Sequence, residues 1–341
     1  MIMIENAIAQ LTNQKNLDFA TTQQVMTEIM QGHATDAQIG SFLTALAIKH
    51  ATIDEIAGAA TAMRAQALSF RAGRPTLEIV GTGGDRSNSF NISTTTALVV
   101  AAAGVPVTKH GNRAASSKSG AADVLEALGV KIDLTPAQSL ALLNQTNFAF
   151  MYAREYHQAM RFVAPARQQI KIPTIFNVLG PLANPAHAQM QLLGVYRQDL
   201  MAPLAQVLIK LGVKHAMVVH SRDGLDEISA AAPTDIIDIN DGHLTTTTMT
   251  PEQFGLKRCA HADLIGGTAQ ENAAITRSIL AGEPGAPRDV VLMNAAAALH
   301  IAKPQLTLAD ALALATQTID SGQAAAELTQ LIQKSQAVMA S

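Results

Sequence analysis

Hydrophobic residues in roughly the first 70 positions recur every three or four residues, the spacing of amphipathic helices. Thr21, Thr35 and Thr52 are each followed three residues later by Gln or Glu, the capping-box pattern that begins helices. Gly32 and the Lys49-His50 pair stand where helix ends are expected. After Thr35, one helical face carries Ile39, Phe42, Leu43, Leu46 and Ala47. The pattern therefore predicts an all-helical domain over residues 1–74.

Beyond a linker at residues 71–75, short apolar runs alternate with helical stretches. Predicted helices include Thr95–Ala103, a helix that begins at Ala121, and Asp199–Leu211, with Asp199 as its cap. The alternation predicts an α/β domain with a mostly parallel central sheet, whose ligands bind outside the carboxyl ends of the strands. The runs with strand character are Thr76–Val80, Val105–Thr108, Phe148–Tyr152, Ala216–Val219 and Asp235–Asp238.

The stretch Ile170-Lys171-Ile172-Pro173 interrupts this alternation, directly before Thr174-Ile175-Phe176-Asn177. We expect a segment around residues 163–189 to return to the helical domain as a hinge. The smaller helical domain is then joined to a larger α/β domain made of residues 75–162 and 190–341.

Composition narrows the class of protein. The 341 residues are 48% hydrophobic and 15% charged, so a sizeable core is available. A net charge of −3 argues against a dedicated nucleic-acid surface. The single cysteine, Cys259, fits a reducing compartment and is expected to be a buried thiol. The N-terminus lacks a signal pattern, and the apolar run Ala97–Val107 is too short to span a bilayer, so we expect a cytoplasmic protein without membrane segments.

Two polar loops follow neighbouring strands of the predicted sheet. Residues 81–85, Gly-Thr-Gly-Gly-Asp, come directly after the first strand and lead to Ser93 and Thr94, predicted as helix caps or anion contacts. Residues 109–120 follow the second strand with three cations, three hydroxyls, an amide and two glycines. Small residues and helix N-termini let backbone N–H groups approach phosphate oxygens. Two such loops at one sheet edge predict a phosphate-rich ligand.

A carboxylate pair, Asp226-Glu227, follows another predicted strand at the same edge. Such a pair binds Mg²⁺ well when a polyphosphate supplies further oxygens, although an isolated pair would more often be a solvated turn. Arg167 suits a planar carboxylate, or else is a surface cation, and His157 is either a ligand contact or a core histidine. No zinc spacing or nucleophile motif occurs in the sequence, which favours group transfer from a bound diphosphate over covalent catalysis.

Five ordered motifs together resemble the anthranilate phosphoribosyltransferase family, and the similarity runs nearly end to end. They are Gly81-Thr82-Gly83-Gly84-Asp85, Asn91-Ile92-Ser93-Thr94, the loop from Lys109 to Ser117, Phe176-Asn177-x-x-Gly180-Pro181-Leu182-x-Asn184-Pro185, and Asp226-Glu227. The resemblance implies transfer of phosphoribose from 5-phosphoribosyl-1-diphosphate (PRPP) to the amine of anthranilate in tryptophan synthesis. It also implies a homodimer formed through the helical domain.

The resemblance further implies the site residues. Ser93, Asp226 and Glu227 would bind Mg²⁺, and Lys109 with the two carboxylates would stabilise charge during catalysis. Anthranilate would contact Gly81, Asn112 and Arg167, with His110, His157 and Pro181 lining its channel. PRPP would be held by Gly81, Gly84, Asp85, Ser89, Asn91, Ile92, Ser93, Thr94, Lys109, His110, Gly111, Asn112, Arg113, Ala114, Ala115, Ser116, Ser117 and Ala121.

Some positions depart from the family pattern. Arg86 stands where glycine is common, Ala114 and Ala121 replace frequent serines, Gln158 stands where Pro or Gly is usual, and Pro173 replaces a frequent arginine. None of these changes removes an implied ligand for metal, phosphate or carboxylate. Two alternatives remain open: a transferase of the same fold with another aromatic acceptor, and a non-enzymatic relative that binds nucleic acid.

Overall fold

Four helices form the N-terminal bundle of the computed structural model, which describes residues 3–114 and 118–340. They are α1 (Met3–Thr12), α2 (Phe19–Met30), α3 (Asp36–Lys49) and α4 (Ile53–Ala65). The capping boxes predicted at Thr35 and Thr52 are confirmed. The third, at Thr21, is wrong: the Asp18 carboxylate accepts the Thr21 N–H at 2.7 Å, so α2 begins three residues earlier than a cap at Thr21 would place it.

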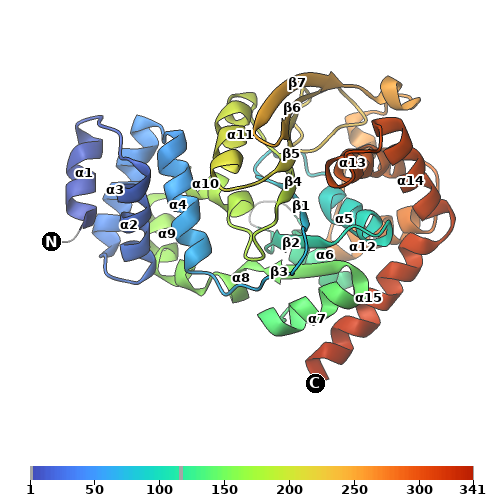
Figure 1. Ribbon diagram of the computed structural model, residues 1–341, viewed down its shortest axis with the longest axis horizontal. Coiled ribbons are helices and arrows are strands. Elements are labelled where there is room, and N and C mark those ends of the chain that lie inside the picture. The colour runs from blue at the N-terminus through green and yellow to red at the C-terminus, as the bar shows by residue number, and fades with distance from the viewer. Residues whose placement is uncertain (1–2, 115–117, 341) are drawn as a thin grey trace.

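A later segment of the chain returns to this bundle. It contains α8 (Ala153–Tyr156), η1 (Gln158–Phe162), α9 (Ala164–Ile170), α10 (Phe176–Leu179) and η2 (Gly180–Leu182). Helix α9 packs against α3, and α10 packs against α4. Apolar side chains of α9 and α10, including Ala166 and Leu179, join the core of the bundle. Figure 1 shows α9 among the helices of the bundle and α10 between α4 and the sheet.

The larger lobe is built on a seven-stranded sheet in the order β3-β2-β1-β4-β5-β6-β7. Its first five strands in this order are parallel, and β6 and β7 are antiparallel, which confirms a mostly parallel sheet. Strands β4 and β7 were not predicted. The strands are β1 (Leu77–Gly81), β2 (Val107–Gly111), β3 (Phe148–Tyr152), β4 (Met190–Gly194), β5 (His215–Ser221), β6 (Thr234–Asn240) and β7 (His243–Met249).

Helices cover both faces of the sheet (Figure 1). Along β5, Met217 and Val219 join the core shared with α5 and α13, whereas Ala216 and Val218 join the core shared with α11 and the bundle. This alternation is the two-residue period of a strand buried on both faces. The helices of this lobe are α5 (Ile92–Ala102), α6 (Ala121–Leu128), α7 (Pro136–Thr146), α11 (Met201–Lys210), α12 (Ala269–Leu280), α13 (Ala286–Ala302), α14 (Leu308–Asp320) and α15 (Gln323–Ala340).

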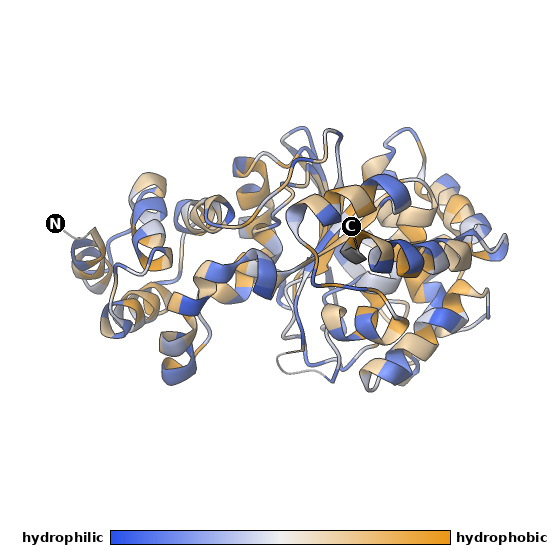
Figure 2. Ribbon diagram, turned by 90° about the horizontal axis from the view of Figure 1, so that it is seen from below, coloured by the Kyte–Doolittle hydropathy of each residue, from blue (hydrophilic) through white to orange (hydrophobic). Residues whose placement is uncertain are grey.

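Short 3₁₀ turns complete the fold: η3 (Gln198–Leu200), η4 (Pro251–Phe254) and η5 (His261–Leu264). The predicted helix over Asp199–Leu211 is therefore divided into η3 and α11, and Asp199 binds Arg197 instead of capping the helix. In the turned view the two lobes lie end to end, with the N-terminus at the outer end of the bundle (Figure 2). Within residues 3–114 and 118–340, no helix is both long and apolar enough to cross a bilayer.

A buried ion pair stabilises the bundle and can be tested. The Glu55 carboxylate accepts from Lys49 Nζ at 2.9 Å and from the Leu17 and Thr52 N–H groups. We expect Glu55→Gln to lower the free energy of unfolding by about 3 kcal/mol, because the buried Lys49 ammonium loses its counter-charge. Urea denaturation measures this change. The matched control is Asp54→Asn, which removes the exposed pair with Lys210 and should cost less than about 1 kcal/mol; equal losses would contradict the assignment.

Candidate active site

The glycine loop after β1 and the carboxylate pair after β5 meet at the carboxyl edge of the sheet. The Gly83 N–H donates to Oδ2 of Asp226 at 2.6 Å. A Cβ at Gly81 would lie 2.3 Å from that same Oδ2 atom, so only glycine permits this approach. Asp226 and Glu227 are both buried. The structure thus brings two of the motifs found in the sequence into direct contact.

Gly194, at the end of β4, is a site residue that the sequence reasoning missed. A Cβ at this position would lie 1.6 Å from the carbonyl oxygen of Asp226. Any side chain there would therefore displace the loop that carries both carboxylates. The signal was the glycine that ends the apolar run Leu192-Leu193, but it could be used only once β4 had been identified as a strand.

Lys109 extends its side chain from β2 under the glycine loop. Its Nζ donates to the carbonyl oxygen of Ile79 at 2.5 Å and to Oγ of Ser93 at 3.2 Å. The prediction that Ser93 and Thr94 are helix caps is wrong, because α5 already begins at Ile92 and both residues lie in its first turn. Ser93 therefore presents its hydroxyl beside Lys109 from inside the helix.

Burial shapes the electrostatics of this edge. Desolvation, together with the neighbouring charge of Asp85, raises the pKa of Asp226 to about 7. Desolvation, and then the charge of Asp226, raises the pKa of Glu227 to about 8. Desolvation lowers the pKa of Lys109 to about 8. Crowded, poorly solvated carboxylates of this kind fit a divalent cation, whose charge favours their ionised forms.

These carboxylates supply only part of a coordination sphere. No group of three or more His, Cys, Asp or Glu side chains in residues 3–114 and 118–340 is arranged to hold a metal ion by itself. Mg²⁺ typically keeps several waters and takes phosphate oxygens in addition to one or two carboxylates. The donor set is therefore suited to a metal that arrives with a polyphosphate.

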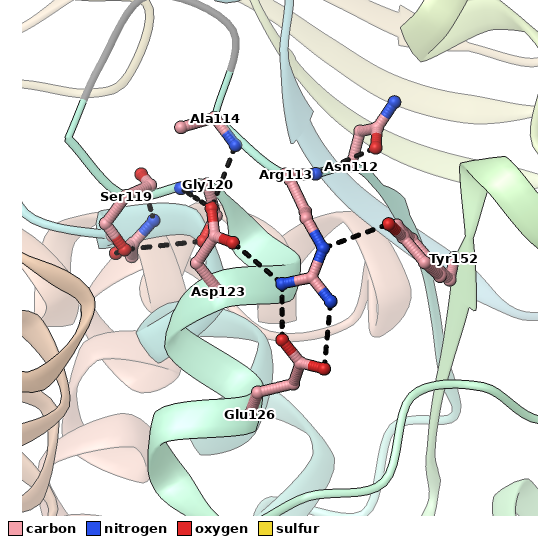
Figure 3. A network of polar contacts seen from close by, with 9 residues as sticks. Asn112, Arg113, Ala114, Ser119, Gly120, Asp123, Glu126 and Tyr152 are labelled. Carbon is pink, nitrogen blue, oxygen red and sulfur yellow. Dashed lines mark hydrogen bonds and ion pairs between the residues drawn. The ribbon is translucent and has the colours of Figure 1, made fainter.

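The second loop is tied to helix α6, as Figure 3 shows. Oδ2 of Asp123 accepts the N–H groups of Ala114 at 2.9 Å and Gly120 at 2.8 Å, so one carboxylate joins both ends of the loop. The Arg113 guanidinium binds the carboxylates of Asp123 and Glu126 and the hydroxyl of Tyr152. Its side chain is therefore engaged by α6 and Tyr152. The predicted PRPP contacts Ala115, Ser116 and Ser117 lie outside the described residues.

Asn91 connects the two loops. Its Nδ2 donates to the Ser119 carbonyl at 3.2 Å, and its Oδ1 accepts from the Ser119 hydroxyl at 3.1 Å and from Asn272 Nδ2 at 2.9 Å. At the first loop, Arg86 has a φ of 58°, a left-handed conformation that explains why glycine is common at this position. The two predicted phosphate loops are thus held side by side.

Two histidines lie where β2 faces the returning segment. The rings of His110 and His157 are 4.9 Å apart, edge to face. Nδ1 of His110 is 3.2 Å from the Gly180 carbonyl, and Nε2 of His157 is 3.1 Å from the Ala183 carbonyl. Desolvation lowers the pKa of His110 to about 3 and that of His157 to about 4, so both rings are neutral at pH 7.

The remaining predicted acceptor contacts come from the same region. Arg167, on α9, is half-buried with its guanidinium 5.1 Å from the centre of the Phe176 ring. The carbonyl of Pro181 accepts from Gln191 Nε2 at 2.8 Å, and Oδ1 of Asn112 accepts the Arg113 N–H.

Cys259 is only partly buried, so the expectation of a buried thiol is wrong.

Comparisons with known proteins agree with this geometry. Residues 5–67 match the model described as the glycosyl transferase family, helical bundle domain, and residues 73–325 match that family's a/b domain. The chain is 85% identical over 339 residues to the anthranilate phosphoribosyltransferase of Lactiplantibacillus plantarum, covering 99% of this chain and 100% of the relative. It is 58% identical to that of Lacticaseibacillus casei, with 97% of each chain covered.

Solved structures show the same similarity. The crystal structure of anthranilate phosphoribosyltransferase from Thermus thermophilus matches with a TM-score of 0.92 and 39% identity, covering 97% of this chain and 99% of that one. The Saccharomyces cerevisiae enzyme in complex with PRPP and Mg matches with a TM-score of 0.88 and 28% identity, covering 99% of this chain and 100% of that one. The same yeast enzyme in complex with 4-fluoroanthranilate matches with a TM-score of 0.87 and 27% identity, with the same coverage of both chains. The chain belongs to the glycosyl transferase family that joins a helical bundle to an a/b domain, and within it to the anthranilate phosphoribosyltransferases.

Proposed function

We propose that this chain transfers the 5-phosphoribosyl group of PRPP to the amine of anthranilate, giving N-(5-phosphoribosyl)anthranilate and diphosphate in tryptophan biosynthesis. The observation that carries this function is the junction of the glycine loop, Lys109 and the Asp226-Glu227 pair at one sheet edge. The yeast relative in complex with PRPP and Mg supports the choice of donor substrate and metal. The relative with 4-fluoroanthranilate supports the acceptor.

The residues divide the chemistry between them. Asp226, Glu227 and Ser93 would hold Mg²⁺, which when bound neutralises charge on the diphosphate. Lys109, with its ammonium directed at Ser93, places a positive charge where the leaving diphosphate gains negative charge as the C1–O bond breaks. The main-chain N–H groups of the two loops orient the remaining phosphate oxygens. An aromatic amine is neutral at pH 7, so positioning can replace a strong general base.

The acceptor would enter from the side of the returning segment. His110, His157 and Pro181 would form channel walls, and Asn112 and Arg167 would bind the carboxylate of anthranilate. A homodimer through the helical bundle and a cytoplasmic location remain part of this proposal.

The first test concerns the carboxylate pair. We expect Asp226→Asn combined with Glu227→Gln to lower turnover at least about 100-fold, because the charges that hold Mg²⁺ and diphosphate are removed. The loss of anthranilate fluorescence on mixing with PRPP and Mg²⁺ measures turnover. The control is Asp235→Asn, which breaks an exposed pair with Arg222 and should leave turnover unchanged. Full activity in the double variant would refute the metal assignment.

The second test concerns the acceptor. We expect Arg167→Ala to raise the KM for anthranilate about 10- to 100-fold, the scale of a lost charged hydrogen bond, while the Kd for PRPP stays within about twofold. Steady-state kinetics and calorimetry separate the two values. Arg161→Ala is a matched control, because this exposed arginine also lies over an aromatic ring, that of Phe162. A selective loss of PRPP binding in Arg167→Ala would show that the carboxylate role is wrong.

The third test uses the buried histidines. Unfolded histidine takes up a proton near pH 6.5, whereas the folded pKa values of His110 and His157 are much lower, so stability falls as pH drops below 6.5. Each histidine should contribute about 2 kcal/mol to the loss between pH 7 and pH 5. We therefore expect His157→Gln to lose about 2 kcal/mol less than the parent chain over this interval in urea titrations. An unchanged pH dependence would mean that His157 is not held neutral.

A further inference from the structure

Strands β1 and β2 separate at the end that faces the active site. They share a single registered pair, Leu77 with Val107, whereas β1 and β4 share five, as do β2 and β3. The same register continued by two residues would place Ile79 opposite Lys109. In a parallel ladder, the Ile79 carbonyl would then accept the His110 N–H, and the Thr108 carbonyl would face β1. The register of the two strands includes no pair at Ile79 and Lys109.

Three side chains take over those main-chain groups. Nζ of Lys109 donates to the Ile79 carbonyl at 2.5 Å. Oε1 of Glu78 accepts the His110 N–H at 3.1 Å. Nδ2 of Asn184, from the returning segment, donates to the Thr108 carbonyl at 2.8 Å. These three main-chain groups therefore keep a hydrogen-bond partner although the strands are not registered at this end, as buried backbone groups require.

Glu78 and Asn184 reach this gap from opposite sides of the lobe boundary. Glu78 is fully buried on β1, and Asn184 is 1% exposed beyond η2. The charges that act on Glu78 are those of Lys109 and Arg64. Arg64, on α4, is itself held by the Leu182 carbonyl at 2.6 Å. Burying a carboxyl group costs free energy of desolvation, which an apolar residue at this position would avoid. The hydrogen bond to the His110 N–H is what an apolar residue could not provide.

We infer that Glu78 and Asn184 are positioning residues that hold the end of β2 apart from β1 and so fix the wall of the acceptor channel. This inference rests on the proposed function, in which His110 would line that channel and Asn112 would bind the acceptor carboxylate. If the strands paired instead, the His110 N–H would occupy the Ile79 carbonyl. Lys109 would then lose the contact that directs its ammonium at Ser93.

The experiment compares Glu78→Ala with Glu78→Gln. Glutamine keeps an oxygen at the reach of the His110 N–H, whereas alanine removes the acceptor. We expect Glu78→Ala to raise the KM for anthranilate about tenfold, and Glu78→Gln to stay within about twofold of the parent chain. The control is Thr276→Val, which removes another buried hydroxyl contact, 2.8 Å from Oγ1 of Thr95, and should lower the Tm without raising KM.

The outcomes separate the inference from the function on which it rests. No reaction in the parent chain would overturn the proposed function itself. Parent-like kinetics in Glu78→Ala, or equal damage in both Glu78 variants, would overturn the positioning role, because acceptor geometry would then not decide the KM. If Glu78→Ala does not fold, Asn184→Ala tests the same gap from the other side. It should raise the KM for anthranilate about tenfold, and unchanged kinetics there would overturn the inference.

Discussion

The desolvation of charge at the carboxyl edge of the sheet is the constraint on which the rest of this structure depends. Lys109, Asp226 and Glu227 are all buried. Burial lowers the pKa of Lys109 and raises those of Asp226 and Glu227, so it favours the neutral form of each group. Such groups persist only where compensating contacts surround them. Here those contacts are main-chain groups of the glycine loop and of β1. The backbone must therefore approach the charged side chains closely, and the residues at the closest approaches must be glycines.

Gly81 and Gly194 follow directly from this constraint. They lie opposite each other in the register of β1 and β4, and a Cβ at either position would collide with Asp226. Two adjacent strands thus end in glycine to admit one loop from a third strand. The arrangement seats the carboxylates deep enough to lose water, yet beside the main-chain donors that would orient phosphate. The burial that disfavours the ionised carboxylates in the isolated site would be offset when a metal ion binds together with a charged ligand.

The sequence predicted the parts of this arrangement that have a local signature. Glycine-rich and hydroxyl-rich loops, capping boxes and apolar runs gave the fold class and the sheet edge. Strand β7 was missed because its residues, His-Leu-Thr-Thr-Thr-Thr-Met, are mostly exposed and show no alternation. Strand β4 follows the returning segment, and no polar loop like those after β1 and β2 marks its end. The separation of β1 from β2 has no local signature, because periodicity identifies strands but not which main-chain groups pair between them.

The two lobes carry different parts of the recognition problem. In the proposed reaction, donor and metal chemistry would depend on charge and would lie on the α/β lobe, between β1, β2 and the loop after β5. Acceptor recognition would combine the charge of Arg167 with the neutral rings of His110 and His157. It would join β2 to the returning segment, where Nδ1 of His110 lies 3.2 Å from the Gly180 carbonyl. Strand β2 is common to both, because it carries Lys109 and its Thr108 carbonyl accepts from Asn184 of the returning segment. Under the proposed function, this shared strand would couple the position of the acceptor to that of Lys109, and so help to align the reactive sugar with the amine.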